Sequence, residues 1–178
     1  MQFFQPKANY LLFIIKELNM ENEFRKKDLQ GRVHFSQDFD NYYYTAGTED
    51  DYDKIDVYAT AKTQLERTYA IEIKDYTNSG FDRPYDKYNK NGFDKGYQID
   101  YEKLDWLCKE AAETNRIPIL YARFTDYTIV WDLSKIDWKG RESLVLVNKN
   151  GQNYGAEREW SRQTYLYKTE AVWVKRTS

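Results

Sequence analysis

The fold of this chain is decided by residues 53–74, which read DKIDVYATAKTQLERTYAIEIK. Apolar and polar residues alternate over Asp53–Ala59, and the same period of two returns over Thr68–Lys74. Such alternation is typical of β-strands. The polar segment between the two runs predicts a turn centred on Gln64, so we expect an antiparallel hairpin.

The register of this hairpin brings acidic side chains together. A turn centred on Gln64 places Asp56 directly opposite Glu72, with Cβ atoms about 4.5–5.5 Å apart. In the second strand, Glu72 and Lys74 share one face and Ile73 lies on the other. Two carboxylates at that distance repel each other unless a cation lies between them. The hairpin therefore predicts a cation site at the edge of a sheet.

Magnesium is the cation that fits these ligands. Mg²⁺ prefers oxygen and is commonly held by one or two carboxylates together with phosphate oxygens of the substrate. Asp56, Glu72 and the backbone carbonyl of Ile73 match that description, and Mn²⁺ is the expected substitute. Such an ion can polarise a phosphodiester and activate water, while Lys74 orients the nucleophile or offsets developing charge. The alternative is a merely solvated face of the sheet.

The rest of the chain predicts further helices and strands on both sides of the hairpin. The most regular helical stripe lies in residues 97–115, and Gln98 is one position off it in the first turn. The C-terminal segment is expected to pack on the core through Trp160 and Trp173. Taken in order, we expect a helix over residues 7–20, a strand over 33–45, the hairpin, a loop over 75–96, a helix over 97–115, strands over 117–124 and 127–133, and a β-rich extension over 134–178.

With these elements in place, the chain resembles the PD-(D/E)xK nuclease superfamily, whose members include restriction endonucleases and Holliday-junction resolvases. The resemblance rests on Asp56, the triplet Glu72-Ile73-Lys74, the following helix with Gln98 and the strand after it. It covers about residues 9–133. It implies an α/β fold with a three-layer αβββαβ core around a mixed sheet, and Mg²⁺-dependent cleavage of nucleic acid.

The resemblance also implies roles for individual residues. Asp56 and Glu72 would be metal ligands together with the carbonyl of Ile73, and Lys74 would be the catalytic lysine. Gln98 would help to position the substrate. An acidic residue on the first helix, Glu17 or as second choice Glu21, would be a further ligand. The chain departs from the superfamily motif in one respect, because Ile55 stands where the motif has a proline.

Composition excludes several other classes of protein. His34 is the only histidine, which excludes zinc sites with two histidines and nucleases built on a histidine pair. We expect it at a strand edge. The only cysteine, Cys108, cannot form an intrachain disulfide and is expected to pack in a helix. The apolar run Tyr10–Ile15 is too short to span a bilayer, so we expect a cytoplasmic protein without membrane contact.

Charge is distributed unevenly along the chain. The net charge is only -2, which is unusual for a protein that binds nucleic acid. However, nine basic and five acidic residues give residues 135–176 a net charge of +4, and aromatic residues are interleaved with them. Positive charge beside aromatic rings suits a phosphate backbone and unpaired bases. DNA is therefore the expected partner, with RNA and a homodimer left open.

The sequence as a whole predicts one nuclease-like domain over residues 1–178, with its core at about 7–133. The expected activity is metal-dependent hydrolysis of phosphodiester bonds in DNA, as an endonuclease rather than an exonuclease. Two other classes stay open. One is a catalytically inactive nucleic-acid-binding or assembly module on the same fold. The other is a carbohydrate- or protein-binding domain that uses its many aromatic residues as stacking surfaces.

Overall fold

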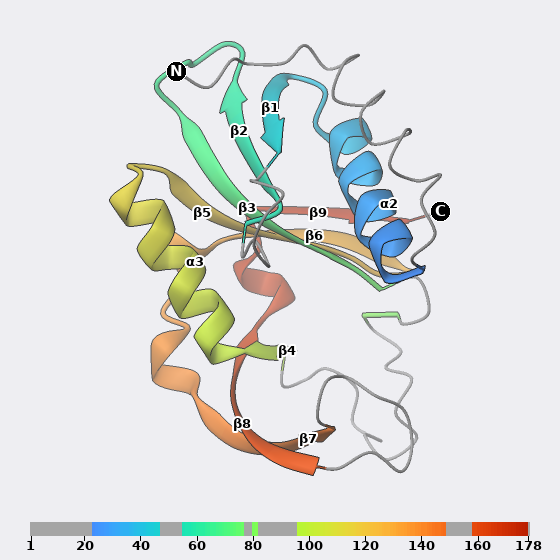
Figure 1. The fold of residues 1–178 in the computed structure, drawn as a ribbon, viewed down its shortest axis with the longest axis vertical. Helices are drawn as coiled ribbons and strands as arrows, with labels where there is room; N and C mark the ends of the chain where they lie inside the picture. Colours follow the sequence, from blue (N-terminus) through green and yellow to red (C-terminus); the bar gives the residue numbers. More distant parts are fainter. Residues whose placement is uncertain (1–22, 47–54, 77–79, 82–95, 149–157, 178) are drawn as a thin grey trace.

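The computed structural model describes residues 23–46, 55–76, 80–81, 96–148 and 158–177 (Figure 1). The predicted helix over residues 7–20, which contains Glu17, lies outside the described residues, and so do Glu21 and most of the predicted loop over 75–96. In chain order, the helices and strands are α2 (Glu23–Asp38), β1 (Tyr42–Ala46), β2 (Val57–Ala61), β3 (Thr68–Asp75), β4 (Tyr97–Asp100), α3 (Tyr101–Glu113), β5 (Ile117–Arg123), β6 (Tyr127–Asp132), β7 (Ser143–Asn148), β8 (Arg158–Leu166) and β9 (Trp173–Arg176).

The predicted α/β class with a mixed central sheet is confirmed. Six strands form this sheet in the order β1-β2-β3-β5-β6-β9. The pair β3 and β5 is parallel, and the other four pairs are antiparallel. Helix α3 packs on one face of the sheet and helix α2 on the other (Figure 1). Strand β3 is therefore central and covered on both faces.

The predicted hairpin is confirmed in its register. Val57 pairs with Ile71, and Thr60 pairs with Thr68, as a turn centred on Gln64 requires. The turn is closed by a hydrogen bond of 2.9 Å from the Arg67 N–H to the Gln64 carbonyl. The alternation of β3 is also confirmed, because Ala70 packs in the cluster beneath α3 while Ile71 and Ile73 pack in the cluster beneath α2.

The predicted strand over residues 33–45 is wrong in its first half. Helix α2 continues to Asp38, and only Tyr42–Ala46 forms a strand. Phe35 and Phe39 are four residues apart, a spacing that fits one face of a helix as well as one face of a strand. Phe35 in the helix and Phe39 just after its end both pack in the cluster beneath α2, with ring centroids 5.2 Å apart. No helix in the described part of the chain is long and apolar enough to cross a membrane.

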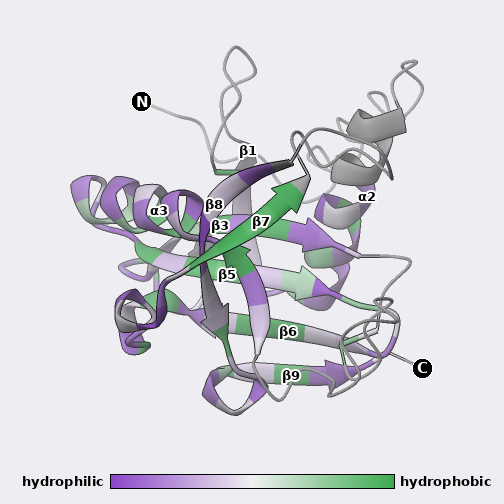
Figure 2. Ribbon diagram, turned by 90° about the horizontal axis from the view of Figure 1, so that it is seen from below, coloured by the Kyte–Doolittle hydropathy of each residue, from purple (hydrophilic) through white to green (hydrophobic). Residues whose placement is uncertain are grey.

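The C-terminal segment is only partly the extension that the sequence predicts. Strands β7 and β8 join β4 in a second sheet of order β4-β8-β7, whereas β9 becomes the edge strand of the central sheet. Trp173 packs on Phe39 with ring centroids 5.1 Å apart. The expected packing of Trp160 is wrong, because this residue is 69% exposed beside the hydrophobic strand β7 (Figure 2). Trp160 pairs with Leu146 of β7, which is also exposed.

Helix α2 approaches strand β3 closely at Gly31. A Cβ atom at this position would lie 3.0 Å from Ile73 Cγ2 and 3.3 Å from Asp75 Cβ. We expect Gly31→Ala to push α2 away from the sheet and to lower the free energy of unfolding by about 1–3 kcal/mol. Urea denaturation followed by circular dichroism measures this change.

A matched control is available at Gly140, where the nearest atom to an added Cβ would be Asp137 Oδ2 at 3.7 Å. Gly140→Ala is expected to change the stability by no more than about 0.5 kcal/mol. Equal stability of the two variants would contradict the close packing of α2 on β3.

Candidate functional site

The site is built around Glu72, which lies near the carboxyl end of β3 on the face covered by α3. Its neighbour on this face, Ala70, is fully buried in the cluster beneath α3, and Glu72 itself is only 1% exposed. A buried carboxylate is costly unless cations or hydrogen bonds compensate its charge. The surroundings of Glu72 must therefore supply positive charge.

Two lysines supply this charge. Lys74 Nζ and Lys103 Nζ each lie 2.5 Å from the same oxygen, Glu72 Oε1. Lys74 follows Glu72 on the same face of β3, while Lys103 comes from the first turn of α3. Both ion pairs are to Oε1, and among the described residues none donates a hydrogen bond to the second oxygen, Oε2, although this atom is buried. Glu72 thus keeps an acceptor available for a ligand.

The charge state of Lys74 follows from this arrangement. Burial by itself lowers the pKa of Lys74, but the charge of Glu72, the contact with it and the more distant charge of Asp56 raise the pKa by more. The result is a pKa above the ordinary value of 10.5. Lys74 is therefore an ammonium ion at neutral pH, and it cannot accept a proton there.

This raised pKa gives a prediction for stability. A group with a raised folded-state pKa contributes stability below its unfolded pKa, and that contribution is lost as the pH rises through the folded value. We expect Lys74→Met to cost about 1–2 kcal/mol of unfolding free energy at pH 7–9, because it removes a charged hydrogen bond. The difference from wild type should shrink only above pH 10.5. Urea denaturation across pH 7–11.5 tests this, and a difference that already falls between pH 7 and 9 would contradict it.

Asp56 lies immediately before β2, at the opening of the hairpin. Its Oδ2 accepts a hydrogen bond of 2.6 Å from the Ile73 N–H, and its own N–H donates to the Ile71 carbonyl at 3.0 Å. Arg32 Nη2 of helix α2 lies 3.4 Å from Oδ1. The carboxylate of Asp56 therefore replaces the backbone carbonyl that a neighbouring strand would supply as acceptor. Asp56 is only 7% exposed.

The alternation predicted for the first strand is interrupted at Asp56. Val57 and Ala59 pack beneath α2 as a regular strand requires, but Ile55 packs in the cluster beneath α3. The expectation that Ile55 shares a face with Val57 is therefore wrong. The physical reason is local. In a regular pair of strands the Ile73 N–H would donate to a backbone carbonyl, but here it donates to the side chain of Asp56.

The three predicted residues Asp56, Glu72 and Lys74 come from adjacent positions of the hairpin, and Lys74 lies within range of both carboxylate charges. Across the described residues, no group of three or more His, Cys, Asp or Glu side chains is arranged as a metal cluster. In type, two carboxylates and one backbone carbonyl match the oxygen ligands that Mg²⁺ commonly takes from a protein. The buried Oε2 of Glu72 fits the role of a cation ligand.

Gln98 is not where the sequence predicts it. Residues Tyr97–Asp100 form strand β4, and α3 begins at Tyr101 with Asp100 as its N-cap. Gln98 pairs with Tyr165 of β8 and, within the described residues, has no hydrogen bond to Glu72 or Lys74. Lys103 reaches Glu72 instead. The N-cap signal of Asp100 could have located the helix start and hence the first-turn position of Lys103.

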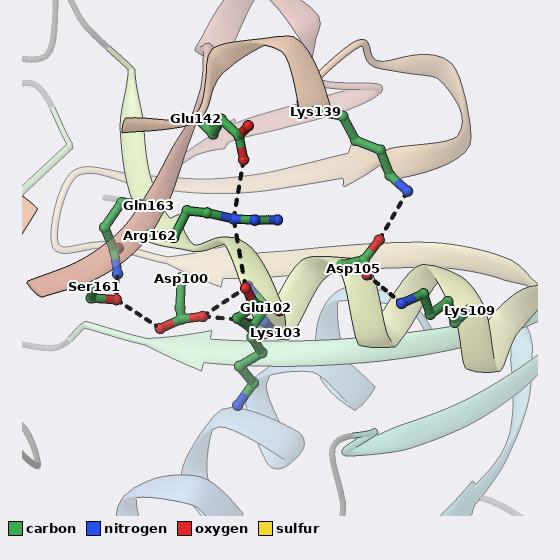
Figure 3. A network of polar contacts seen from close by, with 10 residues as sticks. All are labelled: Asp100, Glu102, Lys103, Asp105, Lys109, Lys139, Glu142, Ser161, Arg162 and Gln163. Carbon is green, nitrogen blue, oxygen red and sulfur yellow. Dashed lines mark hydrogen bonds and ion pairs between the residues drawn. The ribbon is translucent and has the colours of Figure 1, made fainter. Parts of the chain in front are cut away.

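The side chains of the first turn of α3 point in different directions (Figure 3). Arg162 lies 3.0 Å from Glu142 Oε2 and 3.5 Å from Glu102 Oε1, on the side of the second sheet. Lys103 extends on the opposite side of the helix, away from this network (Figure 3). The cation that reaches Glu72 is thus separate from the ion pairs that join α3 to β8.

A second polar cluster lies on the α2 face of the same strand end. His34 Nδ1 is 3.1 Å from Asp75 Oδ2, and Arg123 Nη1 of β5 is 4.0 Å from the same oxygen. The prediction that His34 lies at a strand edge is wrong, because it belongs to α2. No local pattern of residues indicates this cluster, since its members come from the three separate elements α2, β3 and β5.

No family model, curated protein or solved structure matches this chain.

Proposed function

We propose that this protein is a Mg²⁺-dependent nuclease of the PD-(D/E)xK type that cleaves DNA internally. The observation that carries the proposal is the buried Glu72, whose Oε1 holds the ammonium group of Lys74 while its Oε2 has no hydrogen-bond donor among the described residues. A buried acid beside a charged lysine, at the end of a central strand, is an arrangement suited to phosphodiester chemistry.

The order of the elements supports the same proposal. The chain runs α2-β1-β2-β3-β4-α3-β5, and with the short β4 set aside this order is compatible with the αβββαβ core of the superfamily. Asp56 stands at the start of the second strand of this series, and Glu72 and Lys74 lie near the end of the third. These are the positions at which the motif residues of the superfamily are expected.

In the proposed reaction, Asp56, Glu72 and the Ile73 carbonyl would hold Mg²⁺. The bound ion would activate a water molecule and offset charge on the phosphate. Lys74 contributes a fixed positive charge, because Glu72 keeps it protonated and in place. Arg32 and the Ile73 N–H fix the orientation of the Asp56 carboxylate. These contacts hold the two acids in position before substrate arrives.

The test is incubation of the protein with covalently closed plasmid, linear duplex and single-stranded DNA, each in Mg²⁺, Mn²⁺ or EDTA. We expect nicked and linear plasmid with either metal and none with EDTA. A closed circle has no ends, so its nicking identifies an endonuclease. Glu72→Ala and Lys74→Ala should be inactive. Equal activity of wild type and both variants would overturn the proposal.

A second function is favoured by one observation. Two ammonium groups, those of Lys74 and Lys103, contact Glu72 Oε1. Their two positive charges exceed the single negative charge of Glu72. This favours a catalytically inactive module that binds nucleic acid through the same site. DNA binding that is unchanged by EDTA, without cleavage in any metal, would support this alternative. A binding domain with an aromatic groove is favoured by a different observation, because a pocket against the central sheet is lined by the aromatic side chains of Phe35, Phe39, Tyr42, Tyr69 and Trp173.

A further inference from the structure

The contact between Lys103 and Glu72 has no role in the function proposed above. Lys103 belongs to α3, and its ammonium group crosses from the helix to the buried acid of β3. Its side chain is 36% exposed. Lys74 is less exposed, at 27%, and lies on the same strand as Glu72. Of the two lysines, Lys103 is the one that can leave more easily.

While both lysines contact Glu72, they weaken metal binding at this carboxylate. A divalent cation on Glu72 would come close to two ammonium groups, and like charges at short range in a poorly solvated site repel strongly. Asp56 adds only one further negative charge, and Arg32 lies beside it. With Lys74, Lys103 and Arg32 all in place, three positive charges face two carboxylates, and this excess weakens the binding of a cation. A phosphate group would supply the missing negative charge and a new partner for one ammonium group.

We propose that Lys103 exchanges its partner, leaving Glu72 for a backbone phosphate when nucleic acid binds, and so couples metal binding at Glu72 to binding of the nucleic acid. This rests on the proposed function, because it concerns the same metal site. The coupling is reciprocal: if DNA raises the affinity for metal by a given factor, metal raises the affinity for DNA by the same factor. No covalent step is involved.

The experiment measures Mn²⁺ binding by electron paramagnetic resonance, with and without a saturating phosphorothioate DNA that resists cleavage. Wild type is expected to bind Mn²⁺ at least about tenfold more tightly when DNA is present, which is a typical coupling between sites. Lys103→Gln is expected to bind Mn²⁺ more tightly than wild type without DNA, and the gain on adding DNA should largely disappear. DNA affinity of this variant, measured by fluorescence anisotropy without metal, should fall.

The matched control is Lys109→Gln. Lys109 lies on the same helix, is 68% exposed and pairs with Asp105 instead of Glu72. It should show wild-type coupling. If Lys103→Gln also shows wild-type Mn²⁺ affinity and wild-type coupling, the proposal about Lys103 is wrong while the metal site stands. If neither wild type nor either variant binds Mn²⁺ in any condition, the proposed metal site is wrong, and the proposed exchange of Lys103 is wrong as well. Circular dichroism verifies that both variants are folded.

Discussion

Glu72→Gln is expected to lower the single-turnover rate of DNA cleavage by about 10³-fold, which corresponds to about 4 kcal/mol of transition-state stabilisation. Glutamine has nearly the shape of glutamate but no charge. The substitution therefore removes the negative charge that would hold the cation, and it also releases Lys74 from the oxygen that keeps it in place. Both effects act on the same step, so the loss should be larger than for any change outside the site.

The effect on stability should be much smaller than the effect on the rate. The two lysines that lose their partner are 27% and 36% exposed and can turn toward water. The expected cost is about 1–2 kcal/mol, well below that of a fully buried pair. Glu170→Gln is a control, because Glu170 pairs with Arg141 at 2.5 Å on a different part of the molecule. Cleavage by Glu170→Gln should match wild type, and a comparable loss in both variants would contradict a special role for Glu72.

Asp56→Ala is expected to affect folding as well as cleavage. The Asp56 carboxylate is the acceptor for the Ile73 N–H and the partner of Arg32. Alanine leaves a buried backbone donor without its acceptor, which costs about 1–3 kcal/mol, and weakens the attachment of α2. We therefore expect a loss of about 2–4 kcal/mol in the free energy of unfolding from both effects together.

Asp56→Asn separates the two roles of this residue. The amide oxygen can still accept a hydrogen bond from the Ile73 N–H, so most of the stability should return. Cleavage should stay low, because a neutral amide is a weaker ligand for Mg²⁺ than a carboxylate. Urea denaturation and single-turnover cleavage of both variants test this. A loss of stability that is equal for alanine and asparagine would show that the hydrogen bond to Ile73 contributes little.

The hairpin could be predicted because its signals are local. Its two strands alternate with a period of two, and a polar turn between them is symmetric about Gln64, which sets the register. The position of Glu72 beside Lys74 follows from the same alternation. The burial of Glu72 could not be predicted, because it depends on α3, which is far away in the sequence and covers that face of β3.

Other features could not be predicted because they depend on long-range contacts. Strand β4 leads directly into α3, so Tyr97 and Tyr101 look like one helical stripe, although Tyr97 pairs with Leu166 of β8. The same pattern predicts Gln98 in the first turn of a helix, whereas it lies in β4. The link between Lys103 and Glu72 joins a helix to a strand, and no spacing within one element reveals it.

The most direct measurement is the binding of Mn²⁺ to wild type and to Glu72→Gln, each saturated with phosphorothioate DNA and followed by electron paramagnetic resonance. If Glu72 is a ligand of the catalytic metal, wild type should bind a Mn²⁺ ion that Glu72→Gln binds at least about 100-fold more weakly, a loss of about 2.7 kcal/mol. Equal binding of Mn²⁺ by the two proteins would contradict a metal site at Glu72.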